Sequence, residues 1–353
     1  MSALAHRLAA RTLELVDIPS ESRDEAEIAR YVEAAIGPPT WRDGETLWYG
    51  DSLGGRPLVV LAGHLDTVPA QGNLPGAISD GAVVGLGASD MKGGLAVMTE
   101  LARAWQEERD GRELDLGLLF FPREELPASE SPLPDFFDSV PRIHEAALVI
   151  LLEPTDGTIQ AGCLGNLNAR IVFHGVSGHS ARPWMAENAI DRALEGLRPF
   201  AAIEPRPVEI GGLTFTEVAS VTEIHGGIAT NVIPDRVVAN VNFRYAPDRS
   251  SASADAYLRS LVPEGATYEH AGDSPPGRVV ADSPLVQRLA AGGLALEPKQ
   301  AWTNVADFTS RGIDAVNFGP GATRYAHRRD EQVEIASLER AYTSLWRFLT
   351  GSV

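Results

Sequence analysis

Short apolar runs that end in polar side chains constrain the fold of this chain more than any other feature. They lie at residues 58–62, 114–121 and 147–152, and each has the length of a buried strand rather than of a membrane span. An amphipathic pattern at about Met91–Gln106 predicts a helix between two of them. Short buried strands that alternate with helices predict an α/β sheet.

The two ends of the chain extend this pattern. A helix is expected at Leu4–Val16, and a second helix is expected to begin at Ser22, because Ser22 and Glu25 form a capping-box pattern. A further strand is expected near Leu47–Tyr49. The C-terminal part predicts a helix at Ser283–Gly292, a strand at Ala315–Phe318 and a closing helix at about Ile335–Leu349.

The middle of the chain has a different rhythm. It predicts a strand (Asn168–His174), a helix (Glu187–Leu197), two strands (Phe215–Ile224 and Arg236–Tyr245), a helix (Ala252–Leu261) and a last strand (Ala266–His270). This β-α-β-β-α-β order is that of a ferredoxin-like α+β domain. We therefore expect an α/β domain formed by residues 1–165 and 275–353, with a smaller domain inserted at residues 166–274.

Composition excludes several classes of partner and site. The net charge of −18 argues against nucleic acid and anionic membranes as partners, since both attract basic surfaces. The single cysteine, Cys163, allows neither an internal disulfide nor a thiolate cluster, so any metal must be held by histidines and carboxylates. The N-terminus has an amphipathic helix pattern rather than that of a signal peptide, and we expect a cytoplasmic protein.

His64 and Asp66 follow directly after the apolar run at 58–62. Residues two apart on an extended segment point the same way, and ligands of open α/β sheets bind beyond the carboxyl ends of the strands. The pair alone is equally compatible with a surface histidine beside a turn.

Other metal-competent side chains stand near the ends of strands or loops: Asp90, Glu124, Glu125, Glu153 and His327. Two histidines and three carboxylates can hold two zinc ions if one carboxylate bridges them. Asp66 would then orient His64, and one of the paired glutamates would remain free to act as a base.

Seven segments in order carry a resemblance to a known family: GHLDTVP, GASDMKGG, FPREE, LEPTDG, HGVSGHSARP, GGIATNVIPD and AHRRDE. The chain resembles the di-zinc aminoacylase and carboxypeptidase family over nearly its whole length. The resemblance implies a zinc-hydrolase domain with a mixed sheet, in which the inserted domain serves as a dimerisation lid. It also implies a homodimer and two Zn²⁺ ions per chain, for which Co²⁺ can substitute.

The resemblance also implies roles for the residues of the centre. One zinc would be held by His64, Asp90 and Glu153, and the other by Asp90, Glu125 and His327. Glu124 would be the general base and acid, Asp66 would orient His64, and the Asp90–Met91 peptide would be cis.

In the inserted domain, His179 resembles a histidine that reaches across the dimer to the scissile carbonyl of the substrate. Asn231 and Arg244 resemble side chains that bind the backbone amide and the carboxylate of the substrate, although Asn231 could also be a turn residue and Arg244 the exposed end of a strand. Gly321 either shapes the turn toward His327 or offers its backbone to the substrate.

Within the family, Glu153 resembles the deacylases and carboxypeptidases, and the chain looks most like the succinyl-diaminopimelate desuccinylases. These remove the succinyl group from N-succinyl-LL-2,6-diaminopimelate in lysine biosynthesis. Gln160-Ala161-Gly162-Cys163 departs from their usual Arg-Arg-Gly-Ser stretch. An N-acetylornithine deacetylase or another N-acyl amino acid deacylase therefore stays open, as do a non-catalytic metal-stabilised binding protein and a metal-free hydrolase with paired carboxylates.

Overall fold

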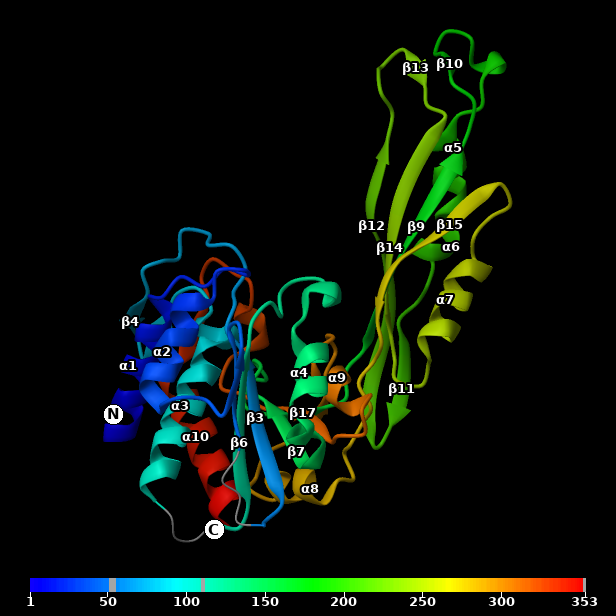
Figure 1. The fold of residues 1–353 in the computed structure, drawn as a ribbon. Helices are drawn as coiled ribbons and strands as arrows, with labels where there is room; N and C mark the ends of the chain where they lie inside the picture. Colours follow the sequence, from blue (N-terminus) through cyan, green and yellow to red (C-terminus); the bar gives the residue numbers. More distant parts are fainter. Residues whose placement is uncertain (51–54, 109–111, 352–353) are drawn as a thin grey trace. The chain divides into compact units, whose positions relative to one another are not determined.

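The computed structural model describes residues 1–50, 55–108 and 112–351 (Figure 1). The chain divides into two compact units. The first contains Met1–Ala161, Val280–Glu297 and Asp307–Val353, and the second contains Gly162–Val279 and Pro298–Ala306.

The first unit is built on an eight-stranded mixed sheet with the strand order β1-β2-β6-β3-β7-β17-β8-β16. Its strands are β1 (Trp41–Asp43), β2 (Thr46–Tyr49), β3 (Leu58–His64), β6 (Asp115–Phe121), β7 (Ala146–Leu151), β8 (Ile159–Ala161), β16 (Leu296–Pro298) and β17 (Ala315–Asn317). The four strands β6, β3, β7 and β17 run parallel to one another, whereas β2 runs antiparallel to β6 and β8 runs antiparallel to β17. The predicted α/β class with a mixed sheet is confirmed.

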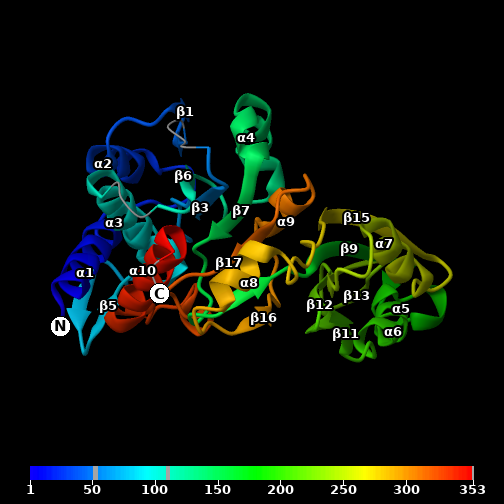
Figure 2. The same cartoon turned by 90° about the horizontal axis from the view of Figure 1, so that it is seen from below.

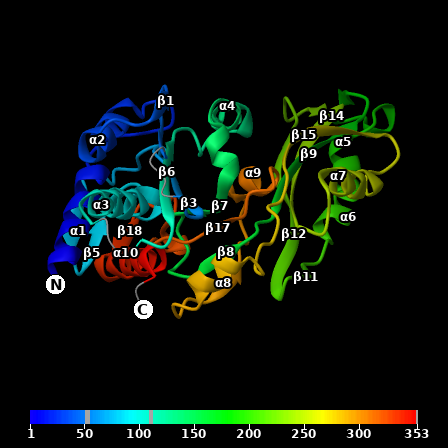
Figure 3. The same cartoon turned by 60° about the horizontal axis from the view of Figure 1, so that its bottom comes forward.

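Helices cover both faces of this sheet, as Figures 2 and 3 show. One face carries α1 (Ala3–Val16), α2 (Ala26–Ile36), α3 (Gly93–Glu107) and α10 (Ile335–Thr350), and the other carries α4 (Leu133–Ser139), α8 (Pro284–Ala290) and α9 (Val305–Thr309). Every residue of β3 and β6 is buried, which explains their nearly continuous apolar sequences.

Smaller elements complete the first unit. A three-stranded sheet has the order β18-β5-β4. These elements are β4 (Ala77–Ser79), β5 (Ala82–Val84), β18 (Gln332–Glu334), the π-helix η1 (Ala88–Lys92), and the 3₁₀ helices η2 (Ala128–Glu130), η3 (Pro141–Glu145) and η5 (Thr323–Tyr325).

The second unit is a five-stranded antiparallel sheet with the order β11-β12-β14-β9-β15, and helices pack on one face (Figure 1). Without the edge strand β11, this order and the connections are those of a ferredoxin-like fold. Its elements are β9 (Gly165–His174), β10 (Gly178–His179), η4 (Pro183–Met185), α5 (Ala189–Gly196), α6 (Arg198–Ala201), β11 (Arg206–Ile210), β12 (Leu213–Gly226), β13 (Val232–Ile233), β14 (Arg236–Tyr245), α7 (Ser251–Ser260) and β15 (Ala266–Ser274).

The start of α2 differs from its prediction. The helix begins at Ala26, and Glu25 at its N-cap makes no side-chain capping bond. The Ser22 hydroxyl instead donates to the Asp66 carboxylate at 2.7 Å, and Glu25 accepts from the backbone amides of Arg23 and Arg123. The capping-box prediction was wrong because both side chains are used in tertiary contacts, which short-range spacing does not reveal.

No helix within the described residues combines the length and the apolar character that crossing a bilayer requires.

Candidate metal centre

The parallel strands of the first unit bring metal-competent side chains to one edge of the sheet. His64 is the last residue of β3, Glu124 and Glu125 follow β6, and Glu153 follows β7. His327 lies on the segment after β17, and Asp90 lies in η1 before α3. Since the strands are parallel, their carboxyl ends coincide, and residues far apart in sequence meet there.

His64, Asp90 and Glu153 form one group, in which one possible ligand atom from each lies within 4.8 Å of the others. His64 Nε2 is 3.1 Å from Asp90 Oδ1 and 3.9 Å from Glu153 Oε1. All three side chains are largely buried, with exposed fractions of 1%, 12% and 7%. A buried group of this composition has the donors that zinc prefers.

Asp90, Glu125 and His327 form a second group under the same 4.8 Å limit. His327 Nε2 is 2.9 Å from Glu125 Oε1 and 3.5 Å from Asp90 Oδ2. The two oxygens of Asp90 therefore face different histidines, so a single carboxylate is common to both groups. The peptide bond after it, Asp90–Met91, is cis, as the resemblance implies.

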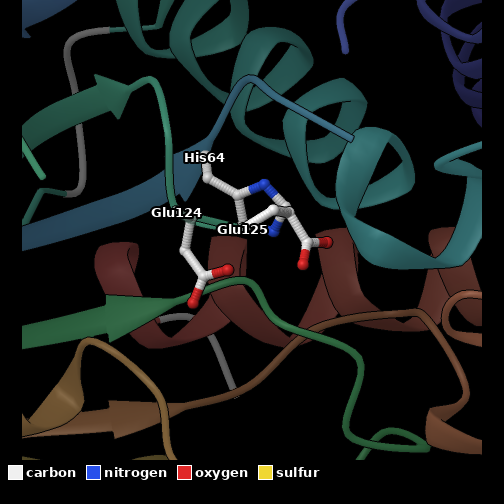
Figure 4. A group of neighbouring side chains, drawn as sticks. All are labelled: His64, Glu124 and Glu125. Atoms are coloured by element: carbon white, nitrogen blue, oxygen red, sulfur yellow. The ribbon is translucent and has the colours of Figure 1, made fainter. Parts of the chain in front are cut away.

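His64, Glu124 and Glu125 form a third group at the end of β3 (Figure 4). Burial raises the pKa of Glu124 well above its usual value, and the charges of Glu153 and Glu125 raise it further. A carboxyl group with a raised pKa is suited to accept and return protons near neutral pH.

Asp66 connects the two strand ends. Its carboxylate accepts from the backbone amides of Glu124 and Glu125 at 3.0 and 3.1 Å, as well as from Ser22. His64 Nδ1 is 3.0 Å from the Asp66 carbonyl oxygen and 3.5 Å from Asp66 Oδ1. Donation from Nδ1 leaves Nε2 of His64 free to face Asp90 and Glu153.

The pKa values of Asp66 and His327 reflect these contacts. Burial alone would raise the pKa of Asp66, but hydrogen bonds from His64, Ser22 and the Glu124 amide lower it to about 2. The hydrogen bond to Glu125 raises the pKa of His327 to about 9, against the opposing effect of burial. The raised pKa of His327 shows negative charge concentrated around this histidine, whereas the lowered pKa of Asp66 reflects the donors around its carboxylate.

Sequence reasoning missed Glu331, which lies four residues after His327. Its carboxylate is 1% exposed and accepts from three backbone amides of the Asp90 loop. Burial raises its pKa to about 7, although the amide donors lower it. The motif AHRRDE ends on this residue, but nothing in the motif itself indicates which backbone groups the glutamate bonds.

Gly321, also in the first unit, is enclosed by backbone. A Cβ atom there would lie 2.2 Å from the Ser89 carbonyl oxygen, and the Gly321 carbonyl accepts from the amides of Thr155 and Asp156. These contacts fix the segment that leads to His327.

Three predicted site residues lie in the second unit. His179 on β10 is exposed, and its Nδ1 accepts from the Ala181 amide at 3.1 Å. The Asn231 carbonyl accepts from the Ser180 amide at 3.0 Å, which places Asn231 beside His179. Arg244 lies near the C-terminal end of β14, where its Nε donates to Asn242 Oδ1 at 3.1 Å.

Comparison with known proteins identifies the family. The sequence profile described as peptidase family M20/M25/M40 matches residues 60–350. The chain belongs to this family. Like other proteins of peptidase family M20/M25/M40, it is a hydrolase that acts on amide bonds.

Individual relatives of this M20 hydrolase match over nearly their whole length. The DapE protein of Mycobacterium tuberculosis is 40% identical over 350 residues, which cover 96% of this chain and 97% of that one. The succinyl-diaminopimelate desuccinylase of Corynebacterium glutamicum is 35% identical over 353 residues, covering 96% and 95%. The solved structure of Bacillus subtilis YXEP, described as a dinuclear metal-binding peptidase of the M20 family, has a TM-score of 0.71 at 15% identity and covers 99% and 98%.

Proposed function

We propose that this protein hydrolyses N-succinyl-LL-2,6-diaminopimelate to succinate and LL-2,6-diaminopimelate. The observation that carries the proposal is its 35% identity, over nearly the full length of both chains, to the desuccinylase of C. glutamicum. The substrate is a small N-acyl amino acid. Its amide bond is cleaved at the centre that the histidines and carboxylates of the first unit form.

Two divalent ions, Zn²⁺ in our proposal, fit the donor set of the centre. His64, Asp90 and Glu153 would hold one ion, and Asp90, Glu125 and His327 would hold the other. The fit rests on the two groups that share Asp90 and on an excess of carboxylates over histidines, which a cation compensates. When bound, the ions supply Lewis-acid activation of a water molecule and of the amide carbonyl.

Glu124 belongs to neither of the two ligand groups. Its carboxylate is therefore available to transfer the proton. It removes a proton from the attacking water as the new C–O bond forms at the succinyl carbonyl. It then delivers that proton to the departing amine as the C–N bond breaks. Asp66 supports this step because it holds the Glu124 and Glu125 amides in place.

The second unit supplies groups for the substrate. Because His179 accepts at Nδ1, its Nε2 carries the proton and donates to the developing oxyanion, and the neighbouring Asn231 binds the substrate amide. Arg244 forms no ion pair with any carboxylate in the described residues, and burial lowers its pKa. A half-buried, unpaired guanidinium is suited to bind a substrate carboxylate.

A homodimer formed through the second unit brings His179 to the partner's centre. An apolar groove between α5 and β12 supports this arrangement. Ile190, Leu194 and Ile224 line it, with exposed fractions of 39%, 65% and 57%. Large apolar side chains exposed together favour burial against another protein surface.

A substrate panel tests the function. The zinc-loaded protein is assayed with succinyl-diaminopimelate, acetylornithine, succinylornithine and acylated glutamates. We expect kcat/KM for succinyl-diaminopimelate to exceed that for acetylornithine by about 10⁴-fold, because a site built for a distal carboxylate is left with unpaired polar groups by an analogue that lacks it. Equal or reversed values would assign the enzyme to N-acetylornithine or another N-acyl amino acid.

A further inference from the structure

Glu331 is a buried carboxylate next to the proposed metal centre that the proposed chemistry does not use. Its Oε2 accepts from the Gly87 amide at 2.8 Å, and its Oε1 accepts from the amides of Ser89 and Asp90 at 3.0 and 2.9 Å. With 1% of its surface exposed, it cannot be a solvated surface charge. One side chain thus satisfies three backbone donors of the loop that carries Asp90.

That loop requires such an acceptor. Gly87 has a left-handed backbone (φ 77°), and Asp90 has non-helical angles (φ −124°, ψ 91°). The amides of residues 87, 89 and 90 therefore point away from a regular helical ladder, and buried amides without an acceptor are costly. Glu331 provides the acceptor from a segment more than 240 residues later in the chain.

The backbone of the Glu331 segment is attached to the same region. The Gly85 amide donates to the Glu331 carbonyl at 2.9 Å, and the Glu331 amide donates to the Arg328 carbonyl at 3.2 Å. Residues 328–331 thus form a turn that begins directly after His327. The side chain and the main chain of Glu331 join the Asp90 loop to the segment that carries His327.

Lys92 places a positive charge near this carboxylate. It is also 1% exposed, and its Nζ donates to the Ile18 carbonyl at 2.8 Å. The Gly87 backbone packs against the Lys92 side chain, since a Cβ at Gly87 would lie 3.0 Å from Lys92 Cδ. Lys92 and Glu331 therefore both contact the backbone of Gly87 at the start of the Asp90 loop.

We propose that Glu331 is a positioning residue that sets the distance between Asp90 and His327 and thereby the affinity of the protein for the ion held by Asp90, Glu125 and His327. The inference rests on the proposed metal centre and goes beyond it. Glu331 is not itself a ligand of the ion. It acts through its hydrogen bonds to the three amides and through its connection to His327. Partners of this kind that orient ligands typically change metal affinity by about 10- to 100-fold when they are removed.

The test compares Glu331→Gln, Glu331→Asp and a control, Glu334→Gln, which makes the same change at an exposed side chain three residues away. Metal-free protein is titrated calorimetrically with Zn²⁺, and the visible absorption of Co²⁺ is recorded in parallel. Both Glu331 variants are expected to bind the ion of the Asp90, Glu125 and His327 group about 10- to 100-fold less tightly than the wild type and to have an altered Co²⁺ spectrum. The control is expected to stay within twofold of the wild type.

Folding is followed separately by the melting temperature of each metal-free variant, with titrations made well below it. If Glu331→Gln does not fold, Glu331→Asp carries the test, because it keeps the charge but is too short to reach all three amides. Wild-type affinity at both sites in a folded Glu331→Asp would overturn the inference, as would wild-type affinity in a folded Glu331→Gln. The substrate panel judges the proposed function independently, since a different preferred substrate would leave these affinities unchanged.

Discussion

At the scale of single residues, adjacent Glu124 and Glu125 have opposite proposed tasks. Glu124→Gln keeps the size of the side chain and removes its basicity, so we expect two ions per chain to be retained and kcat to fall by at least about 10²-fold. Glu125→Gln should instead weaken the ion shared with His327, because Glu125 Oε1 lies 2.9 Å from His327 Nε2. Elemental analysis and kcat measured on the same samples separate the two effects. A Glu124→Gln enzyme with a near wild-type rate would remove Glu124 from the mechanism.

The positions of single residues were predictable where motifs followed strands. His64, Glu125 and Glu153 could be placed near one another because parallel strands end at the same sheet edge. The contacts of Ser22 and Glu331 could not be predicted from the sequence. Each of these side chains forms a hydrogen bond to a segment more than 40 residues away. Sequence spacing carries no information about such contacts.

At the scale of elements, the packing of α3 against the end of β7 positions both Asp90 and Glu153. A Cβ on Gly94 would lie 2.5 Å from the Leu152 carbonyl oxygen, where backbone must move to make room. We expect Gly94→Ala to lower the free energy of unfolding by about 1–3 kcal/mol despite the higher helix propensity of alanine. Arg103→Ala on the exposed side of the same helix should change it by less than about 0.5 kcal/mol. Urea denaturation measures both, and equal stabilities would show that the helix can shift freely.

Long and strongly patterned elements were predicted well, and several short ones were missed. The predicted strand Arg236–Tyr245 has the observed bounds of β14 because its alternate residues are buried. The short strands β8, β16 and β11 had no comparable pattern, since edge or neighbouring strands of three to five residues leave little periodicity. The start of α3 at Gly93 rather than Met91 reflects η1, whose irregular backbone no helical pattern encodes.

At the scale of the whole molecule, the proposed homodimer makes each active centre depend on two chains. His179→Ala should keep the metal content and the melting temperature while kcat falls by about 10²- to 10³-fold, the usual effect of losing one oxyanion donor. Mixed dimers of His179→Ala and Glu124→Gln chains contain one centre with both groups intact, so subunit exchange should restore a substantial fraction of the activity. Mixed dimers as inactive as both parents would mean that His179 does not serve the partner chain.

The central claim is that His64, Asp90, Glu125, Glu153 and His327 hold two ions that the hydrolysis of the amide requires. The most direct measurement follows metal content and the hydrolysis of succinyl-diaminopimelate in the same sample, as Zn²⁺ is returned to chelated protein. We predict no turnover without metal and full turnover as the content approaches two ions per chain. Full activity in the chelated protein, or an active enzyme that never contains more than one ion, would contradict the claim.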